Sequence, residues 1–142
     1  MSKATESSID NRSFGGREDA LIPGRLPVEE VFVKDWGKWY RVQGLTGAGR
    51  DQYEADITVG RGSNQQINVK NARAKLIVLC VVDANGSLLF SRSDVPKLGE
   101  QPASAIQTLF EACRRASGLA QEDFDELTEG FGDAQNGAAT SS

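Results

Sequence analysis

The chain contains no histidine among its 142 residues. Histidine is the most common general base, the usual zinc ligand and the partner of nucleophilic Ser and Cys side chains. The two cysteines, Cys80 and Cys113, stand far apart in apolar runs and form no C-x-x-C motif. We therefore expect no catalytic residues and no bound metal, and we expect two buried thiols.

The sequence also lacks the loops that hold phosphates and calcium. It has no P-loop, no G-x-G-x-x-G motif after a strand and no EF-hand spacing, so no cofactor is expected. The longest apolar run covers only residues 76–82, whereas a membrane helix needs ~20 such residues, and the N-terminus has no signal-like apolar segment. These absences predict a soluble, non-enzymatic protein that acts by binding.

Charge is distributed unevenly along the chain. The formal net charge is −4, and residues 119–142 contain six acidic and no basic side chains. The charged residues of segment 60–75 are all basic: Arg61, Lys70, Arg73 and Lys75. Such a stretch is most often a solvated helix face, but with nearby aromatic residues it could also hold single-stranded nucleic acid. The pI of about 4.9 favours the first interpretation.

Composition predicts one domain with two extensions. Residues 1–26 have no hydrophobic period and are expected to be a disordered or loosely attached arm. Residues 27–131 are the expected domain, and residues 132–142 are an expected disordered tail. Within the domain, β-branched and aromatic residues on both sides of Gly37 predict a β-hairpin with strands at 28–34 and 38–43.

The segment after the hairpin has a helical pattern. Thr46 is a suitable N-cap for a helix over 46–58, and its spacing directs Ala48, Tyr53 and Ile57 toward the core. Gly49 stands where a capping box would have Glu or Gln, so the first turn is expected to fray.

A second helix is predicted over 69–82. Asn68 can cap it, and its apolar stripe begins at Val69. The run 76–82 is rich in β-branched residues, so a buried strand is the alternative interpretation. Residues 83–86 then predict a turn, residues 88–90 a short extended piece, and residues 91–98 a helical turn limited by Pro96.

The clearest helix covers residues 102–117. Pro102 fits its first position, Gly118 fits the left-handed residue after its end, and apolar residues recur at helical spacing between them. A short acidic helix over about 120–129 follows, with a stripe formed by Phe124, Leu127 and Phe131. The predicted fold class is α+β: an N-terminal β-hairpin followed by three or four short amphipathic helices, with disordered termini.

The aromatic residues of the hairpin are the first candidates for a binding surface. Strand alternation puts Trp39 and Arg41 on one face and Tyr40 and Val42 on the other. Trp39 is either an interface anchor or a core residue, and the pattern does not separate these two interpretations. The candidate partner-binding residues are Trp36, Trp39, Tyr40, Phe124, Leu127 and Phe131.

The order of motifs resembles the tail assembly chaperones of long-tailed bacteriophages. Residues 31–54, VFVKDWGKWYRVQGLTGAGRDQYE, match the family pattern of an extended V-x-V, a Trp-Gly turn, a strand of the V-R-V-R type and then L-T-G-x-E-R-D-x-[FY]-E. The similarity continues through NARAKLIVLCVVDANG at 71–86, residues 89–90, 94–99 and 118–119, and an acidic segment. It covers roughly residues 28–130. Gly49 in place of Glu, the long N-terminal arm and the bulky Trp39-Tyr40 pair depart from the pattern.

The resemblance implies a non-enzymatic assembly factor. Such a protein coats the long tape measure protein, keeps it soluble in the host cytoplasm and presents it to the major tail protein, and it is not expected in the mature virion. The resemblance also implies a longer form made by programmed frameshift, and self-association is a further expectation. A head-tail connector or minor tail protein, or a small nucleic-acid-binding regulator, are the alternative functions.

Overall fold

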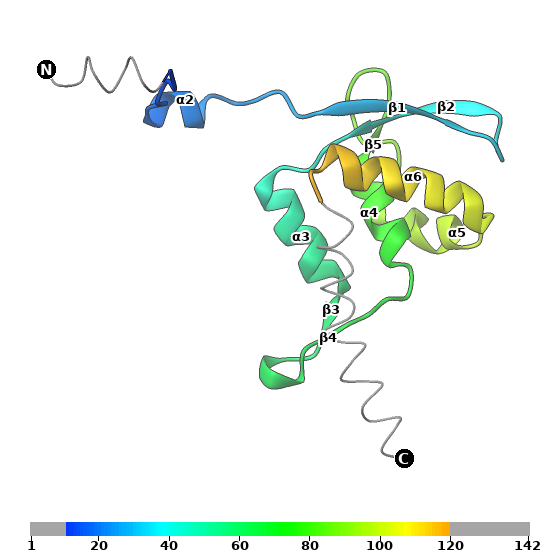
Figure 1. Cartoon of the computed structure of the whole chain (residues 1–142). Coiled ribbons are helices and arrows are strands. Elements are labelled where there is room, and N and C mark those ends of the chain that lie inside the picture. The colour runs from blue at the N-terminus through cyan, green and yellow to red at the C-terminus, as the bar shows by residue number, and fades with distance from the viewer. Residues whose placement is uncertain (1–10, 120–142) are drawn as a thin grey trace, which may run out of the picture.

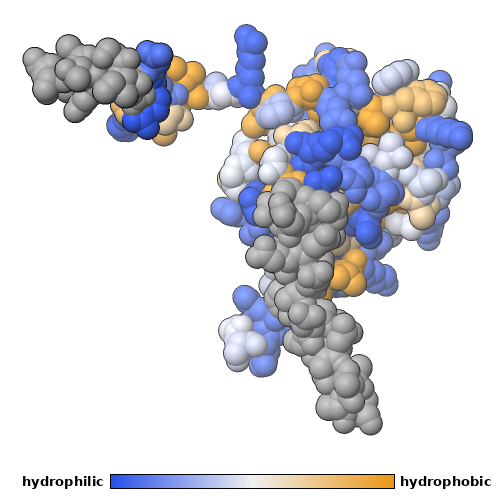
Figure 2. Space-filling view, viewed as in Figure 1, coloured by the Kyte–Doolittle hydropathy of each residue, from blue (hydrophilic) through white to orange (hydrophobic). Residues whose placement is uncertain are grey.

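The computed structural model describes residues 11–119 of the chain, and these residues form a mixed α+β fold, as the sequence predicted. A β-hairpin is followed by several helices that lie on one side of it (Figure 1). The first element, α2 (Arg17–Leu21), belongs to the N-terminal extension and contains no buried residue. It stands apart from the rest of the molecule (Figure 2).

The hairpin consists of β1 (Val28–Val33) and β2 (Lys38–Gln43), paired antiparallel. Both predicted strands are confirmed, although β1 ends one residue earlier than expected because the turn begins at that point. The backbone amides of Trp36 and Gly37 both donate to the carbonyl of Val33. Gly37 has φ 64°, a left-handed conformation that glycine adopts without steric cost.

The helix predicted over 46–58 is α3 (Gly47–Ile57). The hydroxyl of Thr46 accepts a hydrogen bond from the amide of Gly49 at 2.9 Å, so the predicted cap is present. Tyr53 and Ile57 are buried as expected, but Ala48 is exposed. Ala48 lies five residues before Tyr53, which places it about 140° away around the helix and outside the buried stripe.

A small ribbon follows that the sequence analysis did not predict. Strands β3 (Thr58–Val59) and β4 (Gln66–Ile67) pair antiparallel, and the 3-10 turn η1 (Gly62–Asn64) lies between them. The sequence analysis treated residues 60–64 only as a break between helices. Two-residue strands carry too little alternation to be recognised from sequence.

The helix predicted over 69–82 is shorter than expected. Helix α4 (Ala72–Cys80) begins after Asn71, which has φ 59°, and Val69 is 65% exposed. The side chain of Asn68 accepts from the amide of Lys70, so it forms a local turn and does not cap the helix. The predicted cap and the predicted start of the stripe are therefore wrong.

The end of that apolar run is a strand. Residues Val81–Val82 form β5, which pairs antiparallel with Arg41 and Val42 and completes a three-stranded sheet in the order β1-β2-β5. The run 76–82 is therefore divided between a helix and a strand, and neither sequence interpretation describes all of it. The turn over 83–86 is present, and Leu88 returns to form a bridge with Val82.

Two short helical elements precede the longest helix. The 3-10 turn η2 (Arg92–Asp94) leads directly into α5 (Val95–Gly99). Pro96 lies in the first turn of α5, where its missing N–H costs nothing, so it starts the helix rather than limiting one. The prediction for Pro96 was wrong on this point.

The strongest predicted helix is α6 (Ala103–Ala116). Pro102 is its N-cap residue and not, as predicted, its first helical residue. Gly118 has φ 69° and donates to the carbonyl of Arg115, while the amide of Leu119 donates to the carbonyl of Arg114. These two bonds form a Schellman motif, which ends the helix as predicted. The helix predicted over 120–129 lies outside the described residues.

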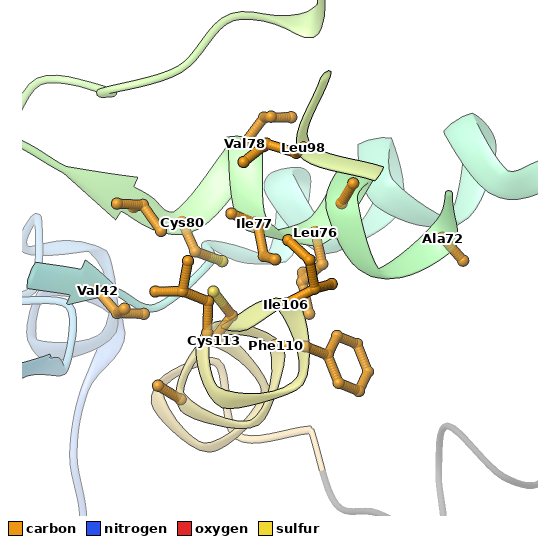
Figure 3. Packing of buried hydrophobic residues seen from close by; sticks show 14 of the residues in the cluster. Val42, Ala72, Leu76, Ile77, Val78, Cys80, Leu98, Ile106, Phe110 and Cys113 are labelled. Atoms are coloured by element: carbon orange, nitrogen blue, oxygen red, sulfur yellow. The ribbon is translucent and has the colours of Figure 1, made fainter. Parts of the chain in front are cut away.

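The core lies where α6 packs against both the sheet and α4 (Figure 3). Its largest fully buried side chains include Phe110, Ile57, Leu76, Ile77 and Leu109. Cys80 and Cys113 are buried free thiols, as predicted, and their sulfur atoms point toward one another. Among residues 11–119, no helix is both long enough and apolar enough to cross a bilayer.

Candidate partner-binding surface

The hairpin has one covered face and one open face. Residues Val33 and Val42 are fully buried beneath α6, and Glu29 on the same face is bonded to Arg115 of that helix. On the opposite face Phe32 is 44% exposed and Trp39 is 68% exposed. No described helix lies over this opposite face (Figure 1).

Phe32 and Trp39 form an aromatic pair on the open face. They are direct cross-strand partners, and their ring centroids are 5.4 Å apart with an interplanar angle of 59°. Tilted pairs at this separation are favourable beyond the area that they bury. Because both rings stand on paired strands, the apolar surface is held in place before any partner arrives.

A shallow hollow of about 320 Å³ adjoins Trp39. An ion pair between Arg41 and Glu30, 2.9 Å long, crosses it, and Arg41 also donates to the carbonyl of Ala84 at 3.2 Å. Leu89, which is 45% exposed, lies at its edge. We call Phe32, Trp39, Leu89 and the Glu30–Arg41 pair the outer surface. It is an apolar centre with charged groups beside it, the usual anatomy of a protein-binding patch.

The predicted distribution of the β2 side chains over two faces is confirmed. Trp39 and Arg41 are on the open face, and Tyr40 and Val42 are on the covered face. Trp39 is therefore not a core residue, which removes one of its two sequence interpretations. Figure 2 shows apolar side chains interspersed with hydrophilic ones at the level of the hairpin.

The rings of Trp36 and Tyr40 pack on the covered face of the hairpin, although Tyr40 also lines the hollow beside Trp39. Both are half-buried against the core, their rings meet edge to face at 5.4 Å, and Trp36 donates to the side chain of Gln101 at 3.2 Å. They line a separate hollow of about 370 Å³ together with Phe90. Trp36 is thus separated from Trp39, whereas Tyr40 lines both hollows. The candidates Phe124, Leu127 and Phe131 lie outside the described residues.

The titratable groups whose pKa values are shifted lie in or beside the core. Burial raises the pKa of Cys113, whereas a hydrogen bond from the Cys113 thiol lowers the pKa of Cys80. Burial also raises the pKa of Tyr53, whose hydroxyl donates to the carbonyl of Ala72 at 3.1 Å. A hydrogen bond from Arg115 lowers the pKa of Glu29. In the described part of the chain, no group of three or more acidic, Cys or His side chains could hold a metal.

No family model and no curated protein matches this chain. Among solved structures, it is similar to the tail assembly chaperone of bacteriophage HK97. The sequences are 16% identical, and the match covers 85% of this chain and 97% of that chain with a TM-score of 0.43.

Phe32 and Leu89 are the apolar residues of the outer surface that the sequence analysis missed. A signal for Phe32 was present, because Phe32 alternates with Val31 and Val33 and an antiparallel turn at Gly37 puts it opposite Trp39. Recognising it required the hairpin register, which the composition of the turn alone did not specify.

The four basic residues of segment 60–75 have different surroundings. Arg61 precedes η1, Lys70 is exposed before α4, and the ammonium of Lys75 donates to the carbonyl of Asp56. The guanidinium of Arg73 lies 5.4 Å from the centroid of the Phe110 ring. They therefore do not share one helix face. The sequence analysis had interpreted this segment as a solvated helix face, which requires that they do.

Proposed function

We propose that this chain is a tail assembly chaperone of a long-tailed bacteriophage, which binds the tape measure protein, keeps it soluble and helps to recruit the major tail protein. The observation that carries the proposal is the outer surface, where a preformed aromatic pair stands on an uncovered sheet face. The resemblance of motifs across residues 28–130 supports the same assignment. On this proposal the protein is not an enzyme.

The outer surface suits the chemistry of the proposed partner. A tape measure protein is a very long, mostly helical chain, and apolar stripes on such a chain aggregate unless they are masked. Phe32 and Trp39 offer a small, rigid apolar contact against which one stretch of such a stripe can pack. A contact of this size gives modest affinity per copy, so many copies in a row could coat the chain and still be displaced.

The charge of the chain supports the last part of the proposal, the recruitment of the major tail protein. The acidic residues after Leu119 give the C-terminal end a negative charge, which would attract a basic subunit by long-range electrostatic steering. Recruitment of the major tail protein should then weaken with rising salt, since exposed charges are screened within a Debye length of about 8 Å at physiological ionic strength. Action in the host cytoplasm, absence from the mature virion, self-association and a frameshifted longer form all belong to this proposal.

The decisive experiment is co-expression with the tape measure protein. We expect the chaperone to raise the soluble fraction of that protein, and we expect the double variant Phe32→Ser with Trp39→Ser to lose this effect. Val59→Ser is the matched control, because Val59 is 47% exposed but lies on β3, away from the hairpin. All variants should retain the thermal unfolding midpoint of the parent protein within a few degrees.

Two outcomes would contradict the proposal. The first is an equally insoluble tape measure protein with and without this chain. The second is recovery of the chain in stoichiometric amounts from purified virions, which mass spectrometry would detect and which would indicate a structural tail protein instead.

A further inference from the structure

Cys80 and Cys113 form a pair of thiols to which the proposed function gives no role. They are the only two cysteines of the chain, and neither belongs to a disulfide. Cys80 is the last residue of α4, and Cys113 lies in the second half of α6. The two helices pack on one another, and the two sulfur atoms point toward one another within the core (Figure 3). The fold therefore brings together two thiols that are far apart in the sequence.

The two thiols are hydrogen-bonded, and this bond makes them unequal. The Cys113 thiol donates to the sulfur of Cys80, and the hydroxyl of Ser117 lies 3.7 Å from the same sulfur. Both groups can donate to a Cys80 thiolate, and the bond from Cys113 lowers the pKa of Cys80. Burial raises the pKa of Cys113. Because the thiolate is the attacking form, Cys80 is the better nucleophile of the pair, and Cys113 is placed to react with it next.

The burial of the pair limits which oxidant can reach it. Cys80 is 1% exposed and Cys113 is fully buried. A bulky disulfide such as oxidised glutathione could react only after α4 and α6 had separated. Hydrogen peroxide is close to water in size, so a small local opening of the core is enough to admit it. A small peroxide is therefore the oxidant that suits this site.

We propose that Cys80 and Cys113 are a peroxide-sensitive pair that closes to a disulfide between α4 and α6. In the first step the Cys80 sulfur attacks one oxygen of hydrogen peroxide. The S–O bond forms, the O–O bond breaks, and the departing hydroxide leaves as water with the proton of Cys80. The Cys113 sulfur then attacks the sulfur of the Cys80 sulfenic acid. The S–S bond forms, the S–O bond breaks, and the proton of Cys113 leaves in a second water.

The two thiols together lose two electrons, and the peroxide is reduced to two molecules of water. The disulfide closes a loop from residue 80 to residue 113, which contains β5, η2 and α5. A cross-link over a long loop restricts the unfolded chain, and here it joins helices that already pack on one another. We therefore expect the oxidised protein to unfold at a higher temperature than the reduced protein. This inference does not depend on the function proposed above.

Oxidation of the folded, full-length protein tests the pair. After the reduced protein is treated with hydrogen peroxide, we expect mass spectrometry to show the loss of two hydrogen atoms per chain. Proteolysis should release a peptide that links Cys80 to Cys113, and no thiol should react with N-ethylmaleimide in denaturant. The thermal unfolding midpoint should rise by several degrees and return to its first value on reduction with dithiothreitol.

Two single variants separate the roles of the two thiols. In Cys113→Ser the attacking thiol has lost its partner, so we expect oxygen to add to Cys80 as a sulfenic or sulfinic acid. Cys80→Ser is the matched control, because its one thiol is the poorer nucleophile, and oxygen should add to it about tenfold more slowly. Circular dichroism checks that each variant is folded, and Cys113→Ala or Cys80→Ala replaces one that is not.

Three outcomes would overturn the proposal. The first is a parent protein whose two thiols stay reduced in peroxide for as long as it is folded. The second is faster oxidation of Cys113 than of Cys80 in the two single variants. The third is a disulfide that joins different chains, which a gel without reductant would show as a covalent dimer.

Discussion

The two faces of the three-stranded sheet differ in what covers them, although both are built from the same strands. On the inner face Val33 and Val42 are fully buried by α6, whereas on the outer face Phe32 and Trp39 remain in contact with solvent. One helical layer is enough to give the hairpin a core, since antiparallel sheets commonly bury only one face. The apolar residues of the other face remain in contact with solvent, and their contribution to folding is limited to the contact between the two rings.

The largest expected difference in stability between the two faces comes from shortening a buried side chain of the covering helix, α6. Leu109→Ala deletes a fully buried side chain of α6, and we expect it to lower the free energy of unfolding by about 2–5 kcal/mol. Trp39→Ala, on the outer surface, should lower it by no more than about 1.5 kcal/mol, because it removes only the contact with the Phe32 ring. Urea denaturation followed by circular dichroism measures both. Equal losses in the two variants would show that the outer face also contributes to the core.

A smaller effect is expected where the sheet meets the end of α6. A Cβ at Gly44 would lie 2.1 Å from the carbonyl oxygen of Ala116, and a backbone atom cannot turn away as a side chain can. Gly44→Ala should therefore destabilise the protein by about 1–3 kcal/mol. Gly47→Ala is the control, because a Cβ there would meet nothing within 4 Å. Thermal unfolding midpoints that coincide for the two variants would refute this account of the junction.

The smallest effect concerns the ion pairs of the two faces. The hydrogen bond from Arg115 lowers the pKa of Glu29 below its ordinary value of 4.5, so the pair stabilises the fold above that pH and its contribution is lost as the pH falls through the lowered pKa. Glu29→Gln should cost less than about 1 kcal/mol at neutral pH, because both side chains are partly exposed.

The pH dependence of the unfolding midpoint checks this prediction. The difference between the parent protein and Glu29→Gln should shrink as the pH is lowered below 4.5. Glu30→Gln supplies the comparison, because Glu30 pairs with Arg41 on the outer face, where both side chains are more than a third exposed. A difference for Glu29→Gln that stays constant with pH would mean that the ion pair is not its source.

Local patterns predicted the elements whose stabilising contacts are local. Helix α6 was predictable because its apolar stripe, the proline at its start and Gly118 at its end all agree. The hairpin was predictable because strand-forming residues flank Gly37. The cap at Thr46 was predictable for the same reason, since its partner amide is only three residues away.

Elements that depend on distant residues were not predictable in this way. Val81 and Val82 leave the helical path because β2 offers them a pairing edge about forty positions earlier in the chain, and no local pattern contains that information. Of the candidate site, the side of the strand on which Trp39 lies followed from alternation. Its exposure did not, because exposure depends on α6 covering the other face.

One consequence follows from the close approach at Gly44. The amide of Gly44 donates to the carbonyl of Pro27, and the amide of Leu45 donates to the hydroxyl of Ser117, so the entry to the first strand and the exit from the last described helix meet at one corner. That corner lies at the opposite end of the hairpin from Gly37 (Figure 1). A shortened domain that begins at residue 27 and ends at residue 119 would therefore have both of its ends near this corner, away from the hairpin tip, and joining those two ends while opening the loop at 83–86 is a natural design for a circular permutant.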